Sequence, residues 1–144
     1  MIRFFETLFG LGSKFSALEI LIINAVRSQL DNSIAILWDR QIQAINKIQR
    51  LSGGVEVDFY RIKGGKPTFS DELVFPNKSE ELLMAKIRIH INNSSANLVA
   101  SIWCVKGFLF SIEYDGSPDY FEEAIKMEPM PQVSITCELT GKLT

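Results

Sequence analysis

The sequence has little of what metal sites, disulfide scaffolds and membrane spans require. It contains one histidine, His90, so no second histidine can share a metal ion with it, and no cysteine stands at metal-motif spacing from it. The only two cysteines, Cys104 and Cys137, lie inside apolar runs, which predicts buried, reduced thiols in a cytoplasmic protein. The longest apolar run of the first helical segment covers residues 20–23, whereas a membrane-spanning helix needs roughly 20 residues. We therefore predict no membrane span.

The chain also lacks a strong excess of either charge. Its 15 basic and 17 acidic side chains leave a net charge of −2, whereas domains that bind nucleic acid are usually strongly basic. We therefore predict no nucleic-acid partner. The charge is unevenly distributed, because residues 113–144 carry two basic and seven acidic side chains. A negative field of this kind speeds association with a basic protein.

With 144 residues, of which 47% are hydrophobic, the chain is expected to form one domain with a sizeable core. We divide it into an apolar N-terminal segment (residues 1–15), a helical part (16–52) and a sheet-rich part (55–144).

Phosphate-binding loops are not expected. The glycines between residues 10 and 14 lack the required spacing and follow no strand, so they predict a turn.

The helical part begins with Ser16 and Glu19, which have the spacing of a capping box. Apolar residues then recur at helical spacing as far as Leu51, and Gly53 and Gly54 end the pattern. The polar residues 31–33 can end one helix and cap the next. The pattern alone leaves open whether residues 16–51 form two helices or one bent helix.

Beyond the glycine pair, apolar and polar residues alternate with the period of two that is typical of strands. The alternation covers residues 55–60, 83–91, 98–105, 108–114 and 133–139, with a tight turn predicted at Lys106-Gly107. Ser117 as N-cap and Pro118 at the first helical position predict a late helix that ends before Pro129. The fold class is therefore α+β: N-terminal helices packed on an antiparallel β-meander of four to six strands, with one late helix and a final strand.

No group of residues has the spacing of a catalytic or cofactor motif, so we predict a non-enzymatic protein without a cofactor. His90 is expected on the polar face of a strand. Glu56 and Asp58 share a strand face, but spacing alone does not show whether they converge with other acids.

The acidic last quarter of the chain also contains tyrosines, and tyrosine beside acids is common in protein interfaces. We predict that a binding surface for a basic protein contains Glu113, Tyr114, Asp115, Asp119, Tyr120 and Glu123. Charge reversal there is expected to slow association with such a partner.

Five stretches of the sequence are distinctive together: Trp38-Asp39-Arg40-Gln41, Val57-Asp58-Phe59-Tyr60, residues 87–91, Ile102-Trp103, and the run from Gly107 to Tyr114. They resemble small bacterial immunity-type proteins of polymorphic or contact-dependent toxin systems. The resemblance covers residues 38–121 and carries no catalytic or metal motif. It implies a cytoplasmic protein that binds and blocks a cognate toxin, and it assigns no role to any single residue.

Two other hypotheses are consistent with the sequence. The first is a small-ligand-binding protein or enzyme with an apolar pocket between the sheet and the helices, lined by Trp38, Tyr60, His90 and Trp103. The second is a homodimer that assembles through the apolar N-terminal segment.

Overall fold

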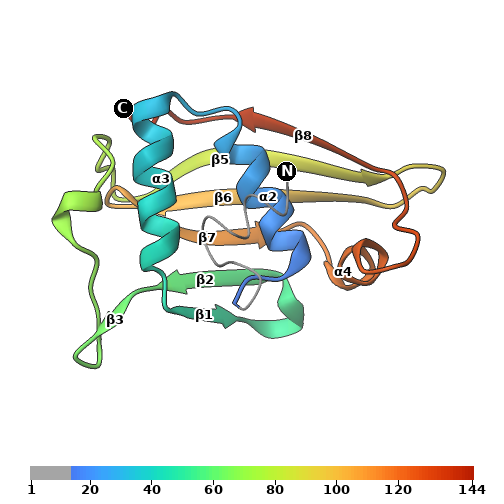
Figure 1. The fold of residues 1–144 in the computed structure, drawn as a ribbon, viewed down its shortest axis with the longest axis horizontal. Helices are drawn as coiled ribbons and strands as arrows, with labels where there is room; N and C mark the ends of the chain where they lie inside the picture. The colour runs from blue at the N-terminus through green and yellow to red at the C-terminus, as the bar shows by residue number, and fades with distance from the viewer. Residues whose placement is uncertain (1–13) are drawn as a thin grey trace.

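The computed structural model describes residues 14–144, apart from the side chain of Ser52. The N-terminal segment up to residue 13, and with it the predicted dimer contact, lies outside the described residues. In the described part, two helices lie on one face of a six-stranded antiparallel sheet, and a third helix lies at one end of the sheet (Figure 1). The α+β class and the order of its parts are confirmed.

The sheet has the strand order β1-β2-β7-β6-β5-β8, and every neighbouring pair is antiparallel. Its strands are β1 (Lys47–Arg50), β2 (Glu56–Tyr60), β5 (Leu82–Ile91), β6 (Asn97–Val105), β7 (Phe108–Tyr114) and β8 (Val133–Leu139). Only β5, β6 and β7 follow each other as a meander. The β1–β2 hairpin joins β7, and the final strand β8 returns to lie beside β5.

The helices are α2 (Ala17–Arg27), α3 (Asn32–Ala44) and α4 (Asp119–Ile125). The predicted capping box is present at the start of α2, where the Ser16 hydroxyl accepts from the Glu19 N–H and the Glu19 side chain accepts from the Ser16 N–H. Because α2 ends at Arg27 and α3 begins at Asn32, the first helical part contains two helices rather than one bent helix.

The prediction that helix continues to residue 51 is wrong, because β1 occupies residues 47–50. Ile45 leaves the helix with extended backbone angles (φ −64°, ψ 122°), and the Asn46 N–H donates to the Tyr60 carbonyl. Ile48 then lies opposite Phe59 in β2. The spacing of Ile45 and Ile48 suits a helix, but residues 47–50 pair with β2, a contact that local spacing does not reveal.

Two turns refine the prediction. Helix α4 begins at Asp119 with Pro118 as its N-cap, so the proline lies one position earlier than predicted, and the Ser117 hydroxyl accepts from the Asp119 N–H at 3.3 Å. Between β6 and β7, Lys106 (φ 52°) and Gly107 (φ 88°) both adopt left-handed angles, as a two-residue hairpin turn requires. A β-carbon on Gly107 would lie 2.5 Å from Val74, so glycine is also needed for space.

The space between the helices and the sheet is filled. The side chains of Ile22, Ile23, Val26, Trp38, Phe59, Ile102, Leu109 and Ile112 meet there and leave no room for a water molecule. The apolar pocket predicted between sheet and helices is therefore not present at this site. The fully buried core extends from Leu18 on α2 to Ile87 on β5.

Two buried polar side chains connect the layers. Gln41 on α3 is 1% exposed, donates to the carbonyls of Leu73 and Gly107, and accepts from the Leu109 N–H at 2.8 Å. Glu19 on α2 is also 1% exposed, and its carboxylate accepts two hydrogen bonds from the Arg50 guanidinium, at 2.7 and 3.0 Å.

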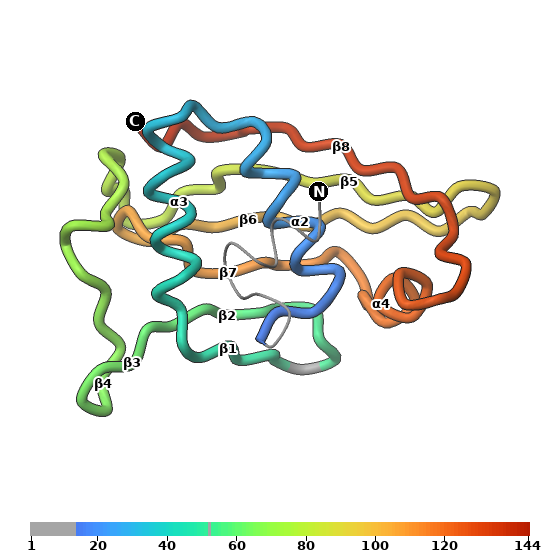
Figure 2. Tube along the Cα trace, viewed as in Figure 1, coloured from blue at the N-terminus to red at the C-terminus, as the bar shows by residue number. Residues whose placement is uncertain are grey.

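The short β3 (Ile62–Lys63) and β4 (Lys66–Pro67) pair only with each other and project beyond the sheet (Figure 2). Among the described helices, none combines the length and the apolar character needed to cross a bilayer.

Candidate functional site

The face of the sheet opposite α2 and α3 is uncovered by any helix of the described residues (Figure 1). In β2, Val57 and Phe59 point into the core, so the alternation of a strand directs Glu56, Asp58 and Tyr60 to this open face. Strand β7 adds to them, because Glu113 lies opposite Glu56 in the register.

The open face contains a cleft of about 230 Å³ over β2, β7 and β6. Its lining combines carboxylates with aromatic and small side chains: Glu56, Glu81, Trp103, Val105, Phe110, Ser111 and Glu113. Tyr60 extends the aromatic part, because its ring contacts the Phe110 ring edge-on with 5.7 Å between centroids.

Asp58 is not itself a lining residue of the cleft, but it shares the strand face of Glu56 and lies directly opposite the lining residue Ser111. It is only 5% exposed, and its Oδ1 has no hydrogen-bond partner. Burial raises the pKa of Asp58 to about 6, with further contributions from Glu56 and Glu113, while the Tyr60 hydroxyl acts in the opposite direction. The Asp58 carboxyl is therefore held beside those of Glu56 and Glu113, and within residues 14–144 no ion pair includes it.

Among the described residues, the strand register places two lysines on strands close to this group. Lys47 on β1 is opposite Tyr60, and Lys86 on β5 is separated from Glu113 by the intervening Ser101 of β6. The ion pairs in the described part of the chain are Arg27–Asp39, Arg50–Glu19 and Lys106–Glu80, and none includes a carboxylate of the cleft.

This combination of groups suits an organic cation. A guanidinium or ammonium group binds to aromatic faces through cation–π contacts and to carboxylates through charge-assisted hydrogen bonds. A guanidinium does both at once, since it is planar and has five N–H donors. Within residues 14–144, no group of three or more His, Cys, Asp or Glu side chains is arranged to hold a metal ion.

The structure separates the first three of the predicted binding residues. Glu113 is exposed in the cleft, whereas its neighbour Tyr114 points to the opposite face and is 8% exposed. Burial raises the pKa of Tyr114, with Glu19 and Glu122 adding to the shift. Asp115 accepts from the Val99 N–H at 2.9 Å, which holds the turn after β7. The prediction that Tyr114 belongs to the surface is wrong, because strand alternation turns it inward.

The other three predicted residues lie together on α4. Asp119 and Glu123 are exposed and one helical turn apart, and Tyr120 is 56% exposed with its ring 5.8 Å from that of Phe121. They form an acidic stripe of their own on α4, a different element from the strands that line the cleft.

The predicted pocket residues do not converge. Trp38 lies in the core, whereas Trp103 and Tyr60 belong to the open face. His90 lies on β5, away from the cleft, and its Nδ1 is 2.9 Å from the side-chain oxygen of Asn97.

The cysteines behave largely as core residues. Cys104 is 1% exposed, and burial raises its pKa to about 12, so its thiol stays protonated at neutral pH. Cys137 is half-buried on β8.

Sequence reasoning noted that Glu56 and Asp58 share a face but missed their meeting with Glu113. The pairing of β2 with β7 joins Glu56 to a residue far along the chain, and no turn connects the two strands directly. The only local signal was a run of polar residues, Glu56, Asp58 and Tyr60, alternating with strongly apolar ones.

Comparisons with protein-family models, with curated proteins and with solved structures found no match for this chain.

Proposed function

We propose that this chain is a non-enzymatic protein-binding module whose open-face cleft accepts a basic segment of a partner protein. The observation that carries the proposal is the Asp58 carboxylate, which is almost fully buried and has one oxygen without a partner. Burying such a group costs stability unless a cation or hydrogen-bond donor compensates it. An arginine or lysine of the partner supplies that compensation.

The rest of the cleft supports the same ligand. Glu56 and Glu113 add two carboxylates on the same face, and Trp103 and Phe110 offer aromatic surface to a planar cation. On α4, Asp119 and Glu123 add to the negative field and speed the approach of a basic partner. The proposed interaction is steric and electrostatic, and no bond is made or broken.

The resemblance to immunity-type proteins suggests the class of partner. If this chain is such a protein, its target is a basic toxin, and the cleft would cover basic residues of the toxin's active site. This role places the chain in the cytoplasm, where free thiols such as Cys104 and Cys137 stay reduced.

The test is titration of the full chain with a tri-arginine peptide, followed by tryptophan fluorescence. Trp103 lines the cleft and reports binding, whereas Trp38 is 1% exposed in the core. We expect saturable binding at low salt that weakens as salt is raised, because salt screens charge–charge attraction. Glu113→Gln is expected to weaken binding about tenfold, the loss of one charge-assisted contact.

The matched control is Glu128→Gln, which removes the same charge from an exposed position after α4. It should leave the affinity within about twofold, since exposed, distant charges are screened. Equal weakening by both variants would mean that net charge alone attracts the peptide and would contradict the proposal. Absence of any fluorescence change at low salt would contradict it as well.

A further inference from the structure

We propose that the chain forms a symmetric dimer in which the β8 strands of two copies pair antiparallel, edge to edge. This inference rests on the outer edge of the sheet and is independent of the cleft. It identifies the partner of that edge as a second copy of the same chain.

Strand β8 is the last strand of the sheet and pairs only with β5 among the described strands. An uncovered edge presents free backbone N–H and C=O groups, and proteins usually protect such edges with lysine, proline or a bulge. Residues 133–139 contain neither lysine nor proline, and their pairing with β5 runs without a register shift. Within the part of the chain that the structure describes, the edge is therefore long, regular and free of these protective features.

The hydrogen-bond pattern shows which groups are free. The Thr140 N–H donates to the Met84 carbonyl, and in an antiparallel pair the bonded residues alternate along the strand. The even-numbered residues of β8 therefore bond to β5. The backbone groups of Val133, Ile135, Cys137 and Leu139 point away from the sheet.

A twofold axis at Thr136 satisfies all of these groups at once. In that register Ile135 bonds with Cys137 of the second copy, and Val133 bonds with its Leu139. Apolar residues thus meet apolar residues on the helix side of the sheet. On the other side Glu138 faces Ser134 of the second copy, so no like charges are opposed.

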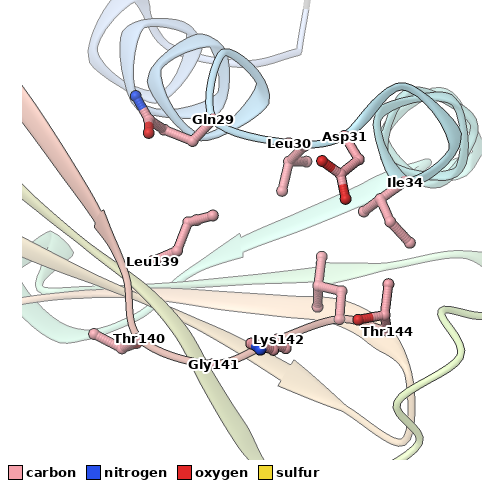
Figure 3. Close-up of a pocket in the computed structure, with 10 residues that line it drawn as sticks. Gln29, Leu30, Asp31, Ile34, Leu139, Thr140, Gly141, Lys142 and Thr144 are labelled. Atoms are coloured by element: carbon pink, nitrogen blue, oxygen red, sulfur yellow. The ribbon is translucent and has the colours of Figure 1, made fainter.

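The same register also brings a side chain of the second copy to a nearby groove. A cavity of about 460 Å³ lies between the α2–α3 connection and the segment after β8, with Leu30 and Ile34 on one side of it and Leu139 on the other (Figure 3). Continuing the pairing beyond the strand brings Met130 of the second copy beside Lys142, at the wall of this groove. Met130 and Leu139 are 49% and 43% exposed in one copy, and the dimer would cover both.

Light scattering of the full chain across a dilution series tests the proposal. We expect twice the monomer mass for the wild type. Thr136→Lys should weaken the dimer at least about tenfold, since it opposes two lysines at the axis. Ser134→Lys is the matched control, because it adds the same exposed charge to β8 but places it opposite Glu138 of the second copy. This control should keep the dimer.

A wild type that is monomeric at every concentration would overturn the proposal. So would a dimer that Thr136→Lys leaves intact, or one that both lysine variants weaken equally. Thermal unfolding followed by circular dichroism shows whether each variant is folded, which separates loss of the dimer from loss of the fold.

Cysteine cross-linking in a Cys137→Ala background tests the register itself. Thr136→Cys places two cysteines in a non-hydrogen-bonded pair with Cα atoms about 4.5 Å apart, within disulfide range. Ser134→Cys separates them by roughly 14 Å along the strands, too far for a disulfide. Oxidation should therefore link the first variant and not the second, and the reverse result, or equal linking, would refute this register.

Discussion

Two buried carboxylates, one on each side of the sheet, are treated differently by the fold. Glu19, between α2 and β1 on the covered side, is 1% exposed and accepts hydrogen bonds from Arg50 and from the Ser16 N–H. Asp58, on the open side, is 5% exposed and has one oxygen without a partner.

The difference separates a buried carboxylate that stabilises the fold from one that does not. A buried charge is tolerated when it is paired and hydrogen-bonded, and Glu19 meets that condition within one copy of the chain. Asp58 meets it only in part, because the Tyr60 hydroxyl favours its charged form but Oδ1 has no hydrogen-bond partner and no ion pair of the described residues includes it. That is the pattern expected of a residue kept for binding rather than for stability.

The largest expected effect tests the covered side. Gln41→Leu removes three hydrogen bonds, which takes this partner from the Leu73 carbonyl and the buried Leu109 N–H, while the Gly107 carbonyl keeps its bond from the Phe75 N–H. We expect a loss of about 4 kcal/mol in the free energy of unfolding, measured by urea denaturation. Arg40→Leu, at an exposed position on the same helix, should change it by no more than about 0.5 kcal/mol. Similar losses in both variants would show that the hydrogen bonds of Gln41 do not stabilise the fold.

The next effect concerns the paired carboxylate. Glu19→Gln leaves the Arg50 guanidinium without its charged partner and is expected to cost about 2 kcal/mol, less than a fully buried pair because the Arg50 side chain is 44% exposed. Urea denaturation of the two single variants and of Glu19→Gln with Arg50→Gln gives the coupling energy. A coupling energy near zero would contradict the importance of this pair.

Asp58→Asn should have the opposite sign. The unfolded chain loses this proton near pH 3.8 and the folded chain near pH 6, so the wild type loses stability as the pH rises between these values. At pH 7 we expect the variant to be more stable by about 3 kcal/mol, with a flatter profile from pH 4 to 6.5.

The same variant should bind the tri-arginine peptide more weakly, while Asp71→Asn, at an exposed position, should change neither property. A variant that is less stable than the wild type at pH 7 would show that Asp58 supports the fold, and the comparison with Glu19 would fail.

The smallest effect concerns α4. Glu123→Lys reverses one exposed charge of the acidic stripe, so we expect the association rate of a basic partner to fall about threefold at low salt and hardly at all at high salt. Stopped-flow fluorescence with the tri-arginine peptide measures this rate. An unchanged rate at low salt would exclude the stripe from the approach of the partner.

Much of the fold was predictable because its signals are local. The capping box at Ser16, the turn at Lys106-Gly107 and the alternation of residues 133–139 each depend on a few neighbouring residues. The strand β1 was missed because Ile45 and Ile48 also suit a helix. Only pairing with β2 decides between the two, and that contact is not visible in local spacing.

The candidate site was less predictable for the same reason. Glu113 was expected at a binding surface together with its neighbours in the chain. Of these, Tyr114 is buried in the core, and Asp115 accepts a hydrogen bond that holds the turn after β7. In space, Glu113 has Glu56 and Asp58 as neighbours, and they come from β2, which pairs with β7 although β3 to β6 lie between the two in the sequence. Gln41 gave no signal at all, since a glutamine on a helix is usually exposed.

The position of β2 beside β7 also has a consequence for synthesis on the ribosome. Residues 47–60 leave the ribosome as a hairpin, and β7, its other neighbour among the described strands, ends at Tyr114. At roughly 5–20 residues per second, that neighbour follows several seconds later. During this interval the apolar sides of Val57 and Phe59 have no sheet to join, so we expect the nascent chain to depend most on chaperones at this stage.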